Sequence, residues 1–225
     1  MLAQRLNATL QSLENAAIGE GRPVPRLLAV SKTRTAMEIA ALAVAGQHAF
    51  GENYVQEAHA KIRELATQNL EWHLIGHLQS NKAELAANLF DWVQTVDRIK
   101  LVPALAGFRS PDRAPLNVLI QVNIDDEASK HGCDPRAIAG LAAAIAAEPR
   151  LALRGLMAIP APHPELEMRR AAYRRMAGLF ADLTMRHQQV DTLSMGMSDD
   201  FPLAVAEGAT MVRIGTALFG PRGRE

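Results

Sequence analysis

Short apolar or β-branched runs recur along the chain, each bounded by polar, glycine or proline residues. Runs of this kind are typical of β-strands. They predict strands over residues 26–32, 48–52, 71–76, 92–97, 117–123, 153–159, 192–197 and 211–215. Between most of these runs, apolar residues recur at the spacing of a helix that packs one face on a core. The helices predicted in this way span residues 36–45, 54–66, 82–89, 98–106, 135–147 and 164–186.

The alternation of strands and helices predicts the fold class. Helical crossovers make successive strands parallel, and eight such units in one chain favour a (β/α)8 barrel, the TIM barrel. A doubly wound open sheet is the second interpretation. A further helix over residues 2–17 precedes the first strand and lies outside the repeat. No linker separates two halves, so we expect residues 1–225 to form a single domain.

Composition and charge exclude several classes of protein. The 225 residues include 24 Lys and Arg against 24 Asp and Glu, and 48% are hydrophobic, which is enough apolar material for a folded core. Zero net charge argues against a nucleic-acid partner, and the basic stretch 169–176 is interpreted as a solvated helix face of mixed charge.

The sequence does not support a membrane span, a signal peptide or an internal disulfide. The apolar run 137–147 is far shorter than the roughly 18 residues of a membrane span, so no membrane partner is expected. Polar residues occupy the N-terminus where a signal peptide has its apolar core, which favours a cytoplasmic location. The single cysteine, Cys133, cannot form an internal disulfide.

Lys32 ends the first predicted strand, in AVSKT, and is the first candidate for chemistry. In a barrel, functional residues lie at the C-terminal ends of the strands, so this ammonium group would project toward the barrel mouth. A lysine that loses solvation becomes an amine nucleophile able to form a Schiff base with an aldehyde. The alternative is a lysine that caps the strand and pairs with a carboxylate.

The loops after the last two strands predict an anion site. Ser198 in GMSDDF is a plausible helix N-cap, and Gly215 and Thr216 follow the eighth strand. Glycine lets the backbone approach a ligand, and N–H groups at helix starts point at phosphate oxygens. The alternative is that these residues only cap a helix and relieve a turn. Arg213 alternates with apolar neighbours in the last strand, so it faces inward and needs a carboxylate, a phosphate or a ring nitrogen as partner.

His73 and His77 have the spacing of zinc ligands on a helix, but Gly76 and the predicted strand remove that helix. We therefore expect no metal site.

Six motifs occur in order over nearly the whole chain: AVSKT, FGENYVQEA, WHLIGHLQSNK, GLMAIP, SMGMSDDF and MVRIGTALFG. With these motifs the sequence resembles the pyridoxal phosphate homeostasis protein family. The resemblance implies a one-domain barrel similar to the N-terminal domain of alanine racemase. It also implies that pyridoxal 5′-phosphate (PLP) is held as an internal aldimine on Lys32.

The resemblance further implies roles for individual residues. Ser198, Gly215 and Thr216 would hold the phosphate, and Arg213 would face the pyridine nitrogen, where a guanidinium makes the cofactor a weaker electron sink. Looser candidates for lining the cofactor are Asn53, His77 and Met157. The loop DDEASKHGC, residues 125–133, departs from the Gly- and Ser-rich version of the family, although Lys130 and Gly132 are retained, so its role stays open.

The expected function is a protein that holds PLP, limits free aldehyde and delivers the cofactor to PLP-dependent apoenzymes. Alanine racemase uses a tyrosine of a second domain as a base; this chain ends about ten residues after the last predicted strand, and Tyr54 and Tyr173 are no obvious replacements. One alternative is a PLP-dependent enzyme with weak racemase or transaminase activity. Another is a barrel enzyme that binds a phosphorylated sugar or aldehyde. We expect a monomer rather than a dimer.

Overall fold

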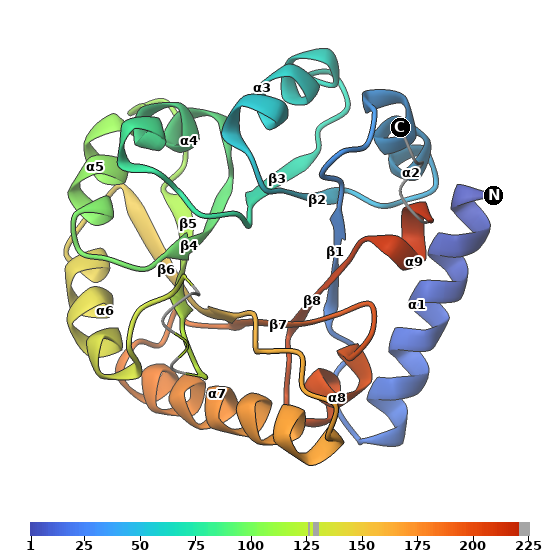
Figure 1. Cartoon of the computed structure of the whole chain (residues 1–225). Helices are drawn as coiled ribbons and strands as arrows, with labels where there is room; N and C mark the ends of the chain where they lie inside the picture. Colours follow the sequence, from blue (N-terminus) through green and yellow to red (C-terminus); the bar gives the residue numbers. More distant parts are fainter. Residues whose placement is uncertain (126, 128–130, 221–225) are drawn as a thin grey trace.

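The computed structural model describes residues 1–125, 127 and 131–220. Eight parallel strands pair in chain order, and the last pairs with the first, so the sheet closes into a barrel (Figure 1). The strands are β1 (Arg26–Val30), β2 (Ala49–Glu52), β3 (Glu71–Leu74), β4 (Trp92–Val96), β5 (Leu116–Val122), β6 (Leu151–Ala158), β7 (Thr192–Met197) and β8 (Met211–Ile214). The predicted TIM barrel is confirmed, and the pairing of β1 with β8 excludes the doubly wound open sheet.

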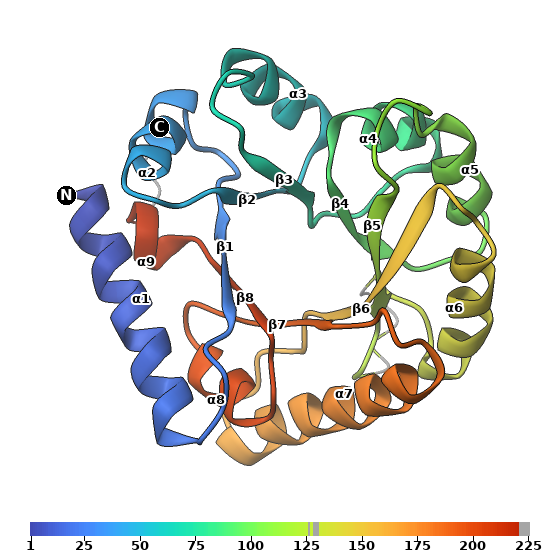
Figure 2. The ribbon, with the colours of Figure 1, turned by 180° about the vertical axis from the view of Figure 1, so that it is seen from behind.

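The helices form a ring around the strands, as Figures 1 and 2 show from opposite sides. They are α2 (Ala36–Val44), α3 (Val55–Glu64), α4 (Ala83–Leu89), α5 (Leu101–Phe108), α6 (Ile138–Ala146), α7 (Leu166–Arg186), α8 (Phe201–Ala206) and α9 (Thr216–Phe219). Single 3₁₀ turns, Ser80–Lys82 and Pro135–Ala137, precede α4 and α6. All the predicted helices are present. No residue ranges were predicted for the last two helices in the chain, because these helices are too short to show a helical period.

Alternation along the strands separates two layers of core. In β1, Leu27 and Ala29 pack outward against the helices, whereas Leu28 packs with Met211 inside the barrel. Val30 also packs inside the barrel, and Lys32 is the next residue in this inward-facing series, so its side chain points toward the barrel mouth. The strand pattern therefore determines which side chains can meet at the C-terminal ends of the strands.

The predicted N-terminal helix is present as α1 (Leu2–Gly19). It buries Leu6, Leu13 and Ala17 and packs on α2, α8 and α9, outside the strands that close the barrel. In the part of the chain that the structure describes, the helices are too short or too polar to cross a membrane. The assignment of residues 1–225 to one domain stays a prediction, since 221–225 lie outside the described residues.

Candidate functional site

Lys32 follows β1 and lines a small cavity of about 80 Å³ at the barrel mouth. Gly215 and Thr216, which follow β8, line the same cavity. Residues far apart in the sequence thus meet because β1 and β8 are neighbours. Within the described part of the chain, the Lys32 amino group has no hydrogen-bond or ion-pair partner, so the alternative of a lysine paired with a carboxylate is not what the structure shows.

The residues on either side of Lys32 are held in place by buried polar groups. The Lys61 ammonium in α3 donates to the Ser31 carbonyl oxygen at 2.8 Å, and the Ser31 hydroxyl donates to Glu52 Oε1 at 2.6 Å. On the other side, the Thr33 N–H donates to Glu57 Oε1 at 2.6 Å. The backbone of Lys32 is therefore fixed, while its side chain has no partner in residues 1–125, 127 and 131–220.

Glu52 and Lys61 are the functional neighbours that sequence reasoning missed. The carboxylate of Glu52 is fully buried and accepts from the Lys61 ammonium at 2.8 Å, and Lys61 also contacts Glu57 at 2.6 Å. Burial raises the pKa of Glu52, while Lys61 and Ser31 oppose the rise. The available signal was the charged Glu52 in an otherwise apolar buried strand, followed by an acidic and a basic residue four positions apart.

Arg213 in β8 points into the barrel and is 3% exposed. Its Nη1 donates to the Ser194 hydroxyl at 2.8 Å, and its Nη2 donates to the Ala158 carbonyl oxygen at 2.8 Å. Burial lowers its pKa to about 10, with Tyr173 and Asp200 opposing, so the guanidinium is charged at neutral pH. A hydroxyl and a carbonyl are thus its partners within the described chain, and its charge is not neutralised by a bound carboxylate.

Ser198 is not the N-cap of a helix, contrary to prediction. Helix α8 begins at Phe201 with Asp200 as its N-cap, and Ser198 lies in the turn between β7 and this cap. The carboxylate of Asp200 does not cap α8 but has two other partners: Oδ1 accepts from the Met197 N–H at 2.8 Å, and Oδ2 accepts from the Tyr173 hydroxyl at 2.7 Å. The part-buried Ser198 keeps its hydroxyl at the end of β7.

Asn53 and His77 lie in the loops after β2 and β3, at the mouth, whereas Met157 is fully buried in the barrel interior against Trp92 and Leu119. The two loops approach closely, because a Cβ at Gly76 would lie 2.1 Å from the Asn53 carbonyl oxygen. Only glycine fits there without moving the backbone. No described contact joins Asn53, His77 or Met157 directly to Lys32, so their role as cofactor lining stays a prediction.

His77 is the one of the two histidines that lies near other potential metal ligands. His77, Asp97 and His131 each offer a ligand atom, and these atoms lie within 4.8 Å of one another. The rings of His77 and His131 are stacked, with centroids 3.8 Å apart and planes inclined by 14°. Their nitrogen lone pairs therefore lie in nearly parallel planes and do not converge on one point. His73 is elsewhere, inside the barrel, with both ring nitrogens engaged, so it does not form a zinc pair with His77.

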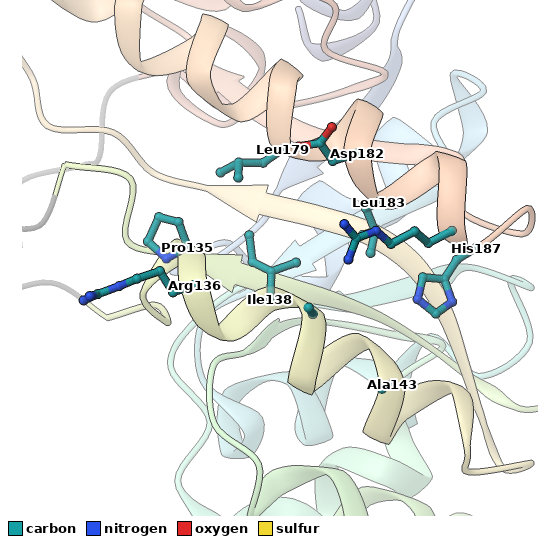
Figure 3. A pocket seen from close by; sticks show the side chains of 10 residues that line it. Pro135, Arg136, Ile138, Ala143, Leu179, Asp182, Leu183 and His187 are labelled. Atoms are coloured by element: carbon teal, nitrogen blue, oxygen red, sulfur yellow. The ribbon is translucent and has the colours of Figure 1, made fainter.

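The outer helices carry a groove that lies apart from these residues. Figure 3 shows it between α6 and α7, with Leu179 and Leu183 facing Ile138; its volume is about 350 Å³.

The basic stretch 169–176 lies in α7. There, Arg174 pairs with Glu207 at 3.1 Å, and Arg175 pairs with Asp125 at 3.3 Å. The basic stretch is thus a helix face of mixed charge. Lys130, in the loop of open role, lies outside the described residues.

The chain matches known proteins over nearly its whole length. A family model described as "Alanine racemase, N-terminal domain" matches residues 3–223. The pyridoxal phosphate homeostasis protein of Haemophilus influenzae is 51% identical over 98% of this chain and 96% of its own length. The protein of the same name from Escherichia coli strain K12 is 55% identical over 87% of this chain and 85% of its own length. The chain belongs to the pyridoxal phosphate homeostasis protein family.

Solved structures extend the comparison. PipY of Synechococcus elongatus PCC7942, solved without PLP, has a TM-score of 0.88 and 37% identity, covering 98% of this chain and all of its own. The PipY structure with PLP bound has a TM-score of 0.85 and 36% identity over the same share of each chain. Alanine racemase of Corynebacterium glutamicum, at 21% identity and a TM-score of 0.68, shares the fold, and this chain covers 61% of that chain.

Proposed function

We propose that this member of the pyridoxal phosphate homeostasis protein family binds PLP at the barrel mouth through Lys32. It holds the cofactor without catalysing a reaction. The observation that carries the proposal is the amino group of Lys32, which has no partner among the described residues and lies beside Gly215 and Thr216 in one cavity. When bound, PLP supplies a reactive aldehyde and an electron-withdrawing ring. The relative PipY has been solved with PLP bound, which supports the same ligand here.

Lys32, Gly215 and Thr216, which line the cavity, together with Ser198 after β7 and Arg213 in β8, offer groups that suit the parts of PLP. Lys32 supplies the amine that holds the aldehyde carbon, and its free state leaves this nitrogen available. Gly215 and Thr216 offer backbone N–H groups and a hydroxyl to a phosphate, with the Ser198 hydroxyl as a third contact. Arg213 offers N–H donors to the ring nitrogen, since a guanidinium donates hydrogen bonds and cannot accept them.

The non-catalytic role rests on the tyrosines. A racemase needs a base on each face of the bound amino acid. The hydroxyl of Tyr173 is buried, donates to Asp200, and has its pKa raised by burial and by that carboxylate, so it does not accept a proton near neutral pH. Tyr54 has a 64% exposed side chain in the loop after β2. Delivery to apoenzymes, a monomeric state and a cytoplasmic location remain predictions.

The experiment is an absorption spectrum of the purified protein with PLP, before and after borohydride, followed by peptide mapping. We expect a band near ~420 nm that borohydride removes, with the label on Lys32. Lys32→Ala should abolish the band, whereas Lys100→Ala, at an exposed lysine, should keep it.

Two results would contradict the proposal. Absence of the band in the unaltered protein would favour a barrel enzyme that binds another phosphorylated aldehyde or sugar. Sustained turnover of an amino acid that is lost in Lys32→Ala would instead identify a PLP-dependent enzyme.

A further inference from the structure

Four buried side chains and one carboxylate form a continuous line of hydrogen bonds through the barrel interior. Arg213 Nη1 contacts Ser194 Oγ at 2.8 Å, and Ser194 Oγ contacts Gln94 Oε1 at 2.7 Å. Gln94 Nε2 contacts His73 Nδ1 at 2.9 Å, and His73 Nε2 contacts Glu71 Oε1 at 2.5 Å. The line joins strands β8, β7, β4 and β3 and ends near the opposite opening of the barrel, where Glu71 pairs with Arg26.

The two ends of this line determine the direction of every hydrogen bond in it. A guanidinium can only donate, and a carboxylate can only accept. Ser194 therefore accepts from Arg213 and gives its own proton to the Gln94 carbonyl oxygen. That contact turns the Gln94 amide nitrogen toward His73, so Nδ1 of His73 accepts and Nε2 carries the proton given to Glu71.

No alternative arrangement satisfies all five groups. The second proton of the Gln94 amide contacts the Met211 sulfur at 3.2 Å, so rotating the amide would place its oxygen against that sulfur and leave Ser194 without an acceptor. Burial lowers the pKa of His73, with Glu71 and Asp91 opposing and Arg26 adding to the fall, which favours the neutral ring that the line requires. The ring also stacks on Trp92 at 5.1 Å between centroids.

We propose that Ser194, Gln94 and His73 are positioning residues for the cofactor ring, acting through Arg213. The one-way line fixes the plane of the guanidinium, and the N–H groups that Ser194 and Ala158 do not use can only donate to a ring nitrogen. The ring nitrogen then stays unprotonated over a wide pH range. The inference rests on the proposed binding of PLP, because it concerns the same site.

The first test needs no cofactor. In the unloaded protein, nitrogen NMR of the His73 ring should show a neutral ring protonated at Nε2 between about pH 6.5 and 8. In Gln94→Glu the new carboxylate cannot donate to Nδ1, so His73 should take a second proton and titrate at higher pH. Ser194→Ala removes one hydroxyl and tests the line with a smaller change. Thr192→Val is the matched control. It removes a hydroxyl from the same strand, and within the described chain that hydroxyl donates only to Asp191.

The second test is the pH titration of the absorption band of the PLP-loaded protein. The band of the unaltered protein and of Thr192→Val should keep its position between about pH 6.5 and 8, whereas the band of Ser194→Ala and of Gln94→Glu should shift with pH over the same range. The titratable groups that act on Arg213 are Tyr173 and Asp200, and neither variant alters them.

A ring of His73 protonated at Nδ1, or the same band titration in the unaltered protein, Ser194→Ala and Gln94→Glu, would overturn the inference. Failure of the proposed function has a different signature, namely no band in any of these proteins. In that case the NMR result still decides whether the one-way line exists.

Discussion

Lys32 is positioned through its neighbours rather than through contacts of its own. Ser31 is held by Lys61 and Glu52, and Thr33 is held by Glu57. Thr33 also has a backbone φ of 62°, a conformation that β-branched residues rarely adopt. The buried carboxylate of Glu52 and the ammonium of Lys61 thus maintain the turn from which the reactive amine projects.

Removal of Lys61 alone should be more damaging than removal of the whole pair. Lys61→Met leaves the Glu52 carboxylate buried without its cation, and we expect a loss of about 3 kcal/mol or more in the free energy of unfolding. The double variant Glu52→Gln with Lys61→Met should regain most of that loss. Denaturant unfolding measures both, with Lys100→Met as an exposed control. Losses that simply add in the double variant would contradict the buried pair.

His73 makes the stability depend on pH. Its pKa is lowered from the usual 6.5 by burial, so the unfolded chain takes up its proton before the folded protein does. The free energy of unfolding should therefore fall as the pH drops below 6.5, by at most about 1.4 kcal/mol per pH unit from this group. His73→Gln, which keeps a donor and an acceptor, should flatten the fall, whereas His48→Gln, at an exposed histidine, should not.

At the scale of residues, the sequence identified Lys32 and Arg213 better than the buried polar groups around them. Lys32 lies at the end of a strand, and Arg213 alternates with apolar residues within one. Because side chains alternate between the two faces of a strand, this pattern shows which way each of these side chains points. Glu52 was missed because its partner Lys61 lies nine residues later, in α3, and only the fold shows that the two side chains meet. The partners of Arg213 lie on two other strands and could not be inferred from its own neighbours.

The loops after β2 and β3 behave as one unit at the scale of elements. Gly76 lies against the backbone of Asn53, and a backbone carbonyl cannot move aside as a flexible side chain can. The sequence predicted the two strands and their following loops, but it gave no sign of this close approach. It also assigned the helix cap after β7 to Ser198, because a serine before acidic residues resembles a cap and the competing contacts of Asp200 come from α7 and β7.

Gly76→Ala should therefore separate the two loops. We expect a loss of roughly 2 kcal/mol or more in the free energy of unfolding and weaker PLP binding, since the shift would reach the mouth. Gly140→Ala is the matched control, because its new methyl group would enter open space on α6 and should raise helix stability by about 0.5–1 kcal/mol. Equal effects of both substitutions on unfolding would contradict the close approach.

For the whole molecule, the alternation of strands and helices was sufficient to predict the barrel, since eight parallel units have few other ways to bury both faces of their sheet. The alternation did not predict the bounds of the short helices α8 and α9. The closed barrel also links ligand binding to global stability, because Lys32 and Gly215 lie on the two strands that close it.

PLP should accordingly stabilise the folded chain as a whole. At a free concentration 100 times the Kd, binding adds about 2.7 kcal/mol to the free energy of unfolding. Denaturant unfolding with and without PLP should show this gain in the unaltered protein and not in Lys32→Ala. A gain of the same size in Lys32→Ala would mean that PLP binds at a different place.

The pairing of β1 with β8 has a consequence for the synthesis of the protein. Arg34, just after β1, donates to the carbonyl oxygen of Gly220, just after α9, at 2.6 Å, and its guanidinium lies 5.4 Å from the centre of the Phe219 ring. During synthesis, the Arg34 side of the cavity beside Lys32 is therefore made 186 residues before Gly220, which follows the other side. A nascent chain that lacks β8 cannot assemble this cavity, so a ligand held there can bind only after that strand has been made, and a chain cut within β8 would lose the cavity along with the closure of the barrel.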